Sequence, residues 1–174
     1  VLGTNNIDFR SRLLTDEEAQ FLASHVAGRT LEESVTYRDL ENAKHVVLVA
    51  FEPEDESPLV FLRLRKGVRD KALRVTTLAP FASRGSEKMD AELIAVRPGG
   101  EAAALADLEL EEEAIILIGE RAAAHEGLLS TAAAKAADSG ARLAWIPRRA
   151  GDIGAIHAGC LPNVLPGGRP VSDA

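Results

Sequence analysis

The chain has 174 residues, of which 46% are hydrophobic, 27 are acidic and 20 are basic, so its formal net charge is −7. That length is sufficient to bury a hydrophobic core. The acidic balance argues against a nucleic-acid partner, because such binding depends on clustered Lys and Arg. No apolar run approaches the roughly 18 residues of a membrane span, so we expect no direct membrane insertion. The single cysteine, Cys160, excludes an internal disulfide and any iron–sulfur or zinc site built from several thiolates of these residues.

The ends of the chain resemble cut sites rather than natural termini. The sequence starts without Met or a signal-peptide pattern, and residues 161–174 are rich in Pro and Gly. We therefore expect a piece excised from a longer protein, with an irregular tail over these last residues. Residues 1–44 are predicted to be a lead-in with one helix, because Thr15 is a suitable N-cap, acidic residues follow it, and Gly28 marks a stop. Residues 31–44 are polar and ambiguous, and a short helix around Leu40-Glu41-Asn42 is an open alternative there.

Two βαβ units are predicted after the lead-in, over residues 45–110 and 111–160. Their elements are, in order, strand 46–50, helix 59–68, strand 74–78, an additional strand 91–96, helix 102–108, strand 114–118, helix 126–137 and strand 142–146. Continuous β-branched apolar runs are typical of strands buried on both faces of a parallel sheet. The sequence therefore predicts an α/β fold with three layers, a mostly parallel sheet and Rossmann-like βαβ units joined by right-handed crossovers.

Ligands of open parallel sheets bind at the carboxyl ends of the strands, which directs attention to two loops. The loop after the first strand begins Ala50-Phe51-Glu52-Pro53 and continues with three further carboxylates. A phosphate cradle needs glycines and a positive field, so this loop is predicted to repel a phosphate. The loop after strand 114–118 offers Gly119 beside Glu120 and is a weak candidate for ligand contact.

Metal and catalytic sites find little support in the sequence. The carboxylates at positions 52, 54 and 55 suit a hard cation, but the glycine and closing Glu of an EF-hand are missing. The alternative is a solvated acidic loop that caps the following helix. Two histidine pairs, His125 with Glu126 and His157 with Cys160, are candidates for acid–base or nucleophilic chemistry. The position of His125 at a helix start argues against the first pair, and the lack of an oxyanion loop argues against the second. We therefore expect no catalytic residue, and we also expect no metal site.

Several segments resemble the molybdopterin oxidoreductase family. They are Gly3-Thr4-Asn5-Asn6-Ile7-Asp8, residues 37–44 before the first strand, the loop with Pro53 and Pro58, residues 62–65, residues 91–99, Gly119-Glu120-Arg121, and residues 158–170. The resemblance covers residues 2–170. Within the family it is greatest to the branch that forms the G subunit of bacterial NADH-quinone oxidoreductases (respiratory complex I).

The resemblance also reveals departures from the cofactor-bearing members. Those members hold a pterin nucleotide with a Gly-Ser-Asn-Pro loop, where this chain has Ala50, Phe51, Glu52 and Pro53. They have an Asp-Pro-Arg turn where residues 79–81 stand, and often Ala-Arg-Leu-Cys-His where residues 10–14 stand. We therefore expect positions 50–53 to be a vestigial pterin loop and the chain to bind no molybdenum cofactor. Iron–sulfur clusters are implied for the parent subunit, on cysteines of an N-terminal region outside this chain.

The resemblance implies a structural domain of a subunit whose complex transfers electrons from NADH to quinone. Its implied partners are the rest of its own subunit and other subunits of the peripheral arm. Its implied location is the cytoplasmic side, peripheral to the inner membrane. Two alternatives stay open. One is a cofactor-holding fragment of an active molybdopterin oxidoreductase, such as a formate-dehydrogenase-like enzyme, and the other is a free-standing nucleotide-binding module.

Overall fold

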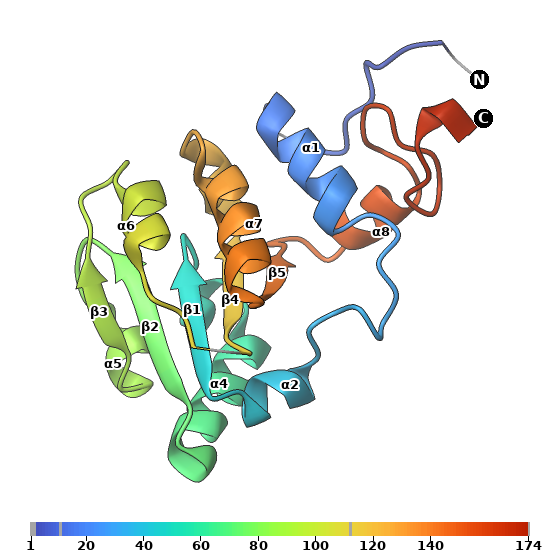
Figure 1. The fold of residues 1–174 in the computed structure, drawn as a ribbon. Helices are drawn as coiled ribbons and strands as arrows, with labels where there is room; N and C mark the ends of the chain where they lie inside the picture. Colours follow the sequence, from blue (N-terminus) through green and yellow to red (C-terminus); the bar gives the residue numbers. More distant parts are fainter. Residues whose placement is uncertain (1–2, 11, 112, 174) are drawn as a thin grey trace.

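The computed structural model describes residues 3–10, 12–111 and 113–173. These residues form a single five-stranded sheet in the order β3-β2-β1-β4-β5, with every pair of neighbouring strands parallel (Figure 1). The strands are β1 His45–Val49, β2 Arg74–Ala79, β3 Glu92–Ala95, β4 Ile115–Gly119 and β5 Arg142–Ile146. The predicted α/β class with a parallel sheet is confirmed.

Helices cover both faces of the sheet, which gives three layers (Figure 1). The helices are α1 Asp16–His25, α2 Tyr37–Asn42, α3 Pro53–Glu56, α4 Pro58–Lys71, α5 Arg84–Lys88, α6 Glu101–Asp107, α7 Leu128–Ser139 and α8 Asp152–His157, with 3₁₀ turns at Glu120–Ala124 and Val171–Asp173. Helices α1, α6, α7 and α8 contribute to one buried cluster, and α2 and α4 contribute to the other. Alternate residues of β1 belong to different clusters, because successive side chains of a strand point to opposite faces.

The lead-in contains the predicted helix α1 and a second, short helix, α2, in the stretch where a helix around residues 40–42 is an open alternative. Helix α1 begins where predicted, since the Thr15 hydroxyl accepts a hydrogen bond from the Glu18 N–H at 3.1 Å. Helix α2 lies in the ambiguous stretch and is fixed by a capping box between Thr36 and Asp39. Helix α1 also stabilises α7, because the Glu17 carboxylate accepts hydrogen bonds from N–H groups at the start of α7. These bonds outweigh desolvation and lower the Glu17 pKa.

Short elements are not predicted by the sequence, because they lack a full turn of periodic apolar residues. Helix α3 lies in the predicted loop after the first strand, α5 lies in a stretch for which no element is predicted, and α8 lies just before the Pro- and Gly-rich tail. The tail itself is irregular apart from a bridge between Val164 and Pro170 and the final 3₁₀ turn. The outermost residues of the predicted lead-in and tail, positions 1, 2 and 174, lie outside the described residues.

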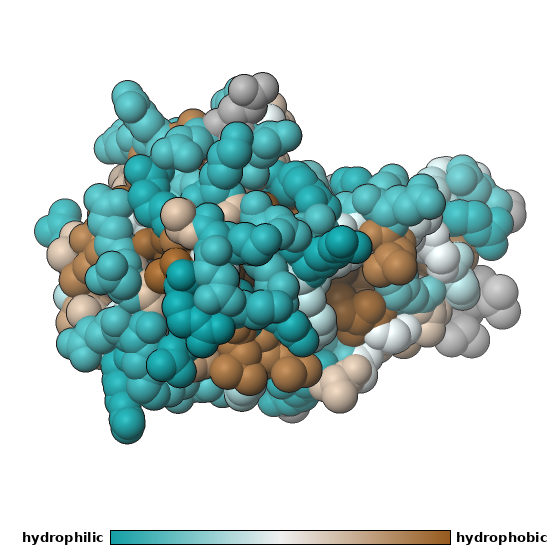
Figure 2. Space-filling model, turned by 90° about the horizontal axis from the view of Figure 1, so that it is seen from below, coloured by the Kyte–Doolittle hydropathy of each residue, from teal (hydrophilic) through white to brown (hydrophobic). Residues whose placement is uncertain are grey.

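No helix in the described part of the chain is long and apolar enough to cross a membrane. Viewed from below, the surface is mostly hydrophilic, and it is interrupted by separate apolar patches, one of which lies in a hollow (Figure 2).

Candidate functional site

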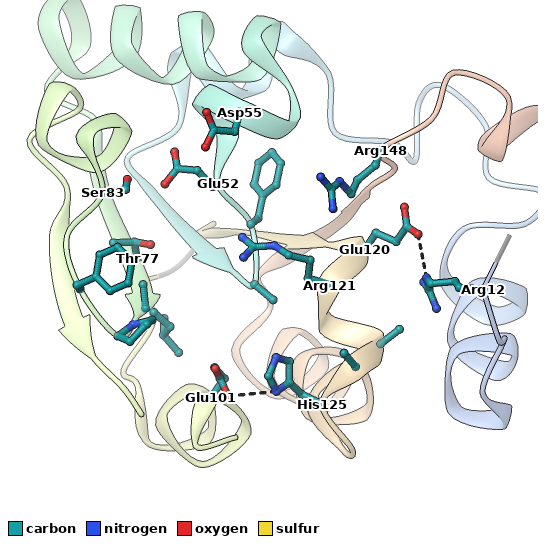
Figure 3. Close-up of a pocket in the computed structure, with 18 of the residues that line it drawn as sticks. Arg12, Glu52, Asp55, Thr77, Ser83, Glu101, Glu120, Arg121, His125 and Arg148 are labelled. Carbon is teal, nitrogen blue, oxygen red and sulfur yellow. Dashed lines mark hydrogen bonds and ion pairs between the residues drawn. The ribbon is translucent and has the colours of Figure 1, made fainter. Parts of the chain in front are cut away.

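A cleft with a volume of about 1200 Å³ lies at the carboxyl ends of the strands. The strand order changes sense between the parallel neighbours β1 and β4, because β2 and β3 lie on one side of β1 whereas β4 and β5 lie on the other. The loops after β1 and β4 form opposite sides of the cleft. Such a switch point is where open α/β sheets bind ligands. Figure 3 labels ten polar residues that line it, which are Arg12, Glu52, Asp55, Thr77, Ser83, Glu101, Glu120, Arg121, His125 and Arg148; Thr15 and Arg149 line it as well.

The loop after β1 forms one side of the cleft. Ala50 has a φ of +47°, a left-handed conformation that favours glycine, and the buried Phe51 packs into the core. Pro53 is buried at the first position of α3. Thus the loop combines a backbone suited to glycine with larger side chains.

Two backbone N–H groups of this loop are occupied by its own carboxylates. The Glu52 N–H donates to Glu56 Oε1 at 2.8 Å, and the Glu54 N–H donates to Glu52 Oε1 at 3.3 Å. Glu52 therefore caps α3, a short helix within the predicted loop. The prediction that the acidic loop caps the helix at 59–68 is wrong, because α4 has Ser57 at its N-cap, no side-chain cap and no acidic residue in its first turn. The prediction that the loop is solvated is wrong for Glu56, whose side chain is only 5% exposed.

Glu56 is buried because cations from two other loops reach it. Its Oε1 lies 2.8 Å from Arg121 Nη2, and its Oε2 lies 3.8 Å from Arg148 Nε. Arg121 follows β4 and Arg148 follows β5, so this carboxylate connects the ends of three strands. We call Glu56, Arg121 and Arg148 the loop cluster.

Gly119 is accounted for by packing between strands. A Cβ at this position would lie 2.4 Å from the Ala50 carbonyl oxygen and 3.0 Å from the Phe51 Cβ. Only glycine therefore allows the end of β4 to approach the β1 loop so closely. Neither Gly119 nor Pro53 is among the residues that line the cleft.

A second ionic group, the lead-in cluster, borders the cleft beside α1; its members are Arg10, Arg12, Glu18 and Glu120. Arg12 donates to both carboxylates, at 2.8 Å to Glu18 Oε1 and 3.0 Å to Glu120 Oε1. Hydrogen bonding to Glu18 raises the Arg12 pKa. The Arg10 side chain is 1% exposed, and its Nη1 lies 3.0 Å from each of the same oxygens. Burial lowers the Arg10 pKa even though these carboxylates oppose that shift.

The two histidines weighed as acid–base or nucleophilic candidates have other partners in the structure. His125 Nδ1 lies 3.6 Å from Glu101 Oε2, across the cleft from α6, rather than engaging Glu126 (Figure 3). His157 Nδ1 accepts a hydrogen bond from the Gly28 N–H at 3.3 Å, which gives this imidazole a role in holding α8 to the end of α1. Residues 3–10, 12–111 and 113–173 contain no group of three or more His, Cys, Asp or Glu side chains arranged for a metal ion.

Sequence reasoning missed the cations of both clusters. Arg12 is separated from Glu120 by 108 positions, and Arg121 and Arg148 lie in different loops. The available signal was the occurrence of arginines just after β4 and β5, at the same sheet edge as the acidic loop. Position 11, which belongs to one of the predicted departures, lies outside the described residues.

Comparison with known proteins places the chain in a family. The family model described as "Molybdopterin oxidoreductase" matches residues 1–139. The chain belongs to the molybdopterin oxidoreductase family. It is 55% identical over 180 residues to the NADH-quinone oxidoreductase G subunit of Mycobacterium tuberculosis, and 46% identical over 200 residues to that of Streptomyces coelicolor. Both matches cover 99% of this chain but only 22% and 24% of the relatives.

The cleft is also where the departures from cofactor-bearing molybdopterin oxidoreductases meet. Its lining includes Ala50, Phe51 and Glu52 of the β1 loop and the 79–81 turn after β2. Arg12 and Leu13 of the lead-in line it as well. Three segments that are distant in sequence thus converge on one cavity.

Proposed function

We propose that this chain is a structural domain of the G subunit of an NADH-quinone oxidoreductase and that it binds no molybdenum cofactor. In this role it stiffens the peripheral arm and packs against the cluster-bearing part of its own subunit and against neighbouring subunits. It lies on the cytoplasmic side of the membrane, and the iron–sulfur clusters belong to the subunit outside these residues. No side chain of this chain is assigned a catalytic step.

The observation that carries the proposal is the pairing of Glu56. A cofactor bearing phosphates needs free N–H donors and uncompensated cations at the switch point. Here the Glu52 and Glu54 N–H groups donate to carboxylates of the same loop, and Glu56 neutralises Arg121. Glu52 adds a further negative charge to the cleft wall. Arg149 lines the cleft without an ion pair to a described residue, but the occupied loop N–H groups, the paired Arg121 and the charge of Glu52 together disfavour a phosphate-bearing cofactor.

The relatives support the rest of the proposal. They are all named as the G subunit of NADH-quinone oxidoreductase, and the aligned region covers nearly the whole chain. Because the chain spans less than a quarter of their length, the activity and partners of the complete subunit are part of the proposal.

Metal analysis of the purified complex tests the absence of the cofactor. We expect iron in amounts typical of a cluster-bearing complex, but neither molybdenum nor tungsten in a stoichiometric amount. Oxidative extraction of the same sample should release no fluorescent pterin. One molybdenum or tungsten per complex would overturn the proposal and favour the cofactor-holding alternative.

Addition of nucleotides tests the remaining alternative. We expect GDP and pyrophosphate at millimolar concentration to leave the melting temperature of the complex unchanged beyond the effect of matched ionic strength. A saturable increase that disappears in an Arg121→Gln variant would favour a nucleotide-binding module instead.

A further inference from the structure

Strand β5 is an edge of the sheet with an unused row of backbone groups. It pairs with β4 on one side, with Arg142 opposite Ile115. The Arg142 N–H donates to the Ala114 carbonyl at 2.8 Å, which fixes the direction of the groups along the strand. Because these groups alternate in direction, those of Leu143 and Trp145 point away from β4. Within the described ranges, these two residues have no hydrogen-bond partner on that outer side.

A groove runs along this edge. A cavity of about 560 Å³ separates β5 from the segment over residues 33–35. Its lining also comes from α1, α7 and α8, including His25, Ala133, Ala136, Ile153 and His157. The Arg142 guanidinium donates to the Ser34 carbonyl at 2.8 Å, so the 33–35 segment is held in place at the start of the strand.

The outer edge of β5 is apolar, so contact with another strand suits it better than contact with water. Exposed edge strands normally carry charges or proline that prevent pairing. Here Arg142 begins β5 and Pro147 follows it, but the four residues between them, 143–146, are all apolar. The groove wall formed by α7 is made of small alanines, which leave room for incoming side chains.

We propose that an extended segment of the same subunit, from outside these 174 residues, binds in this groove as a sixth strand parallel to β5. This inference rests on the proposed function, because it takes the chain to be part of a longer subunit. Doubly wound sheets with the order 3-2-1-4-5 are commonly extended by a sixth strand beside the fifth. Strands that are close in sequence also tend to be neighbours in a sheet. Over three-quarters of each relative lies outside the aligned region, so the relatives contain ample chain to supply such a strand.

The Leu143→Pro substitution removes an edge donor that the domain itself does not use. Proline is tolerated on an edge strand when its missing N–H would have pointed outward. The matched control is Leu93→Pro on β3, the opposite edge. The Val96 N–H donates to the Ala79 carbonyl at 3.0 Å, so by the same alternation the Leu93 N–H also points away from the sheet.

A photo-crosslinking amino acid at Glu33, which lines the groove and is about half exposed, identifies the occupant in the intact complex. We expect a crosslink to a peptide of the same subunit outside these residues. It should be lost with Leu143→Pro and retained with Leu93→Pro. Crosslinks confined to the 174 residues, or to another subunit or a second copy, would overturn the proposal.

Hydrogen exchange of the unmodified complex provides a second test that needs no folded variant. We expect the Leu143 amide to exchange as slowly as the Ala144 amide, which bonds within the sheet. An exchange rate at Leu143 typical of a solvated amide would overturn the sixth strand. The result is independent of metal content: stoichiometric molybdenum would refute the proposed function while leaving both of these measurements interpretable.

Discussion

The two ionic clusters beside the cleft bury different partners. In the loop cluster the carboxylate is buried, while the side chains of Arg121 and Arg148 are about half exposed. In the lead-in cluster Arg10 is buried together with Glu18 and Glu120. None of the Arg10 guanidinium nitrogens makes a well-directed hydrogen bond to any described residue, although Phe9 and Trp145 contact its planar group.

This difference in burial gives the two clusters different roles: the lead-in cluster anchors the chain before α1, and the loop cluster closes a potential anion site. A buried guanidinium is costly to desolvate, so the lead-in cluster is stable only while both carboxylates remain. It attaches the chain before α1 to the strand ends. In the loop cluster the two arginines stay in contact with water, and one carboxylate, Glu56, forms ion pairs with both of them. It therefore closes a potential anion site at a smaller cost to folding.

The largest expected effect is that of Glu18→Gln. This change leaves the buried Arg10 without one of its two carboxylates, and loss of one partner from a buried ion pair typically costs about 3–5 kcal/mol. Urea denaturation of the chain measures the free energy of unfolding. In the complex, we expect less assembled enzyme but an unchanged rate of NADH oxidation per assembled complex.

The control for this prediction is Glu33→Gln, which removes the partner of Arg29 in an exposed pair at 4.0 Å. It should change the free energy of unfolding much less than Glu18→Gln does, because the Glu33 carboxylate and its hydrogen bonds from Thr30 lie in solvent. Equal effects of the two substitutions would show that burial does not distinguish the lead-in cluster.

An intermediate effect is expected for Glu56→Gln. The half-exposed arginines can be solvated after the charge is removed, so we expect a loss of about 1–3 kcal/mol. Arg121 and Arg148 then become available to anions. Pyrophosphate should raise the melting temperature of this variant but not that of the parent chain.

The matched substitution is Glu54→Gln, in the same loop but paired with Lys88 instead of the cleft arginines. It should produce no response to pyrophosphate. A response in the parent chain as large as that in Glu56→Gln would contradict the assignment of Glu56 as the group that occupies the site.

The smallest effect at neutral pH is expected for Asp39, which lies in the α2 capping box and near Arg142. Hydrogen bonds from Thr36 and from Arg142 lower its pKa from 3.8 to about 2. A lowered carboxyl pKa stabilises the fold above the ordinary value and loses that contribution as pH falls toward the folded-state value. Asp39→Asn should therefore cost about 0.2–1 kcal/mol at pH 7.

Denaturation between pH 5 and pH 2 tests the sign of this contribution. The difference in unfolding free energy between the parent chain and Asp39→Asn should shrink as the pH falls below about 4. A difference that grows toward acid would show that Asp39 does not favour the charged form in the folded state.

Local patterns predicted most of the fold. Thr15 and the acidic turn after it fixed the start of α1, and the apolar run at 46–50 indicated a buried strand within one residue of β1. Helix α3 was missed because four residues carry no periodicity, and its start depends on Pro53 and the Glu52 cap. The predicted start of α7 at residue 126 was two positions early, because Gly127 is left-handed and the helix begins at Leu128.

The sequence alone determined that the loop after the first strand is acidic, lacks glycine and cannot resemble a phosphate cradle. Those properties follow from residue types at consecutive positions. Only the tertiary structure decided that the Glu56 side chain is buried and that Arg121 and Arg148 form ion pairs with it. Coulomb energy depends on distance in space, and the strand order β1-β4-β5 brings together loops that are far apart along the chain.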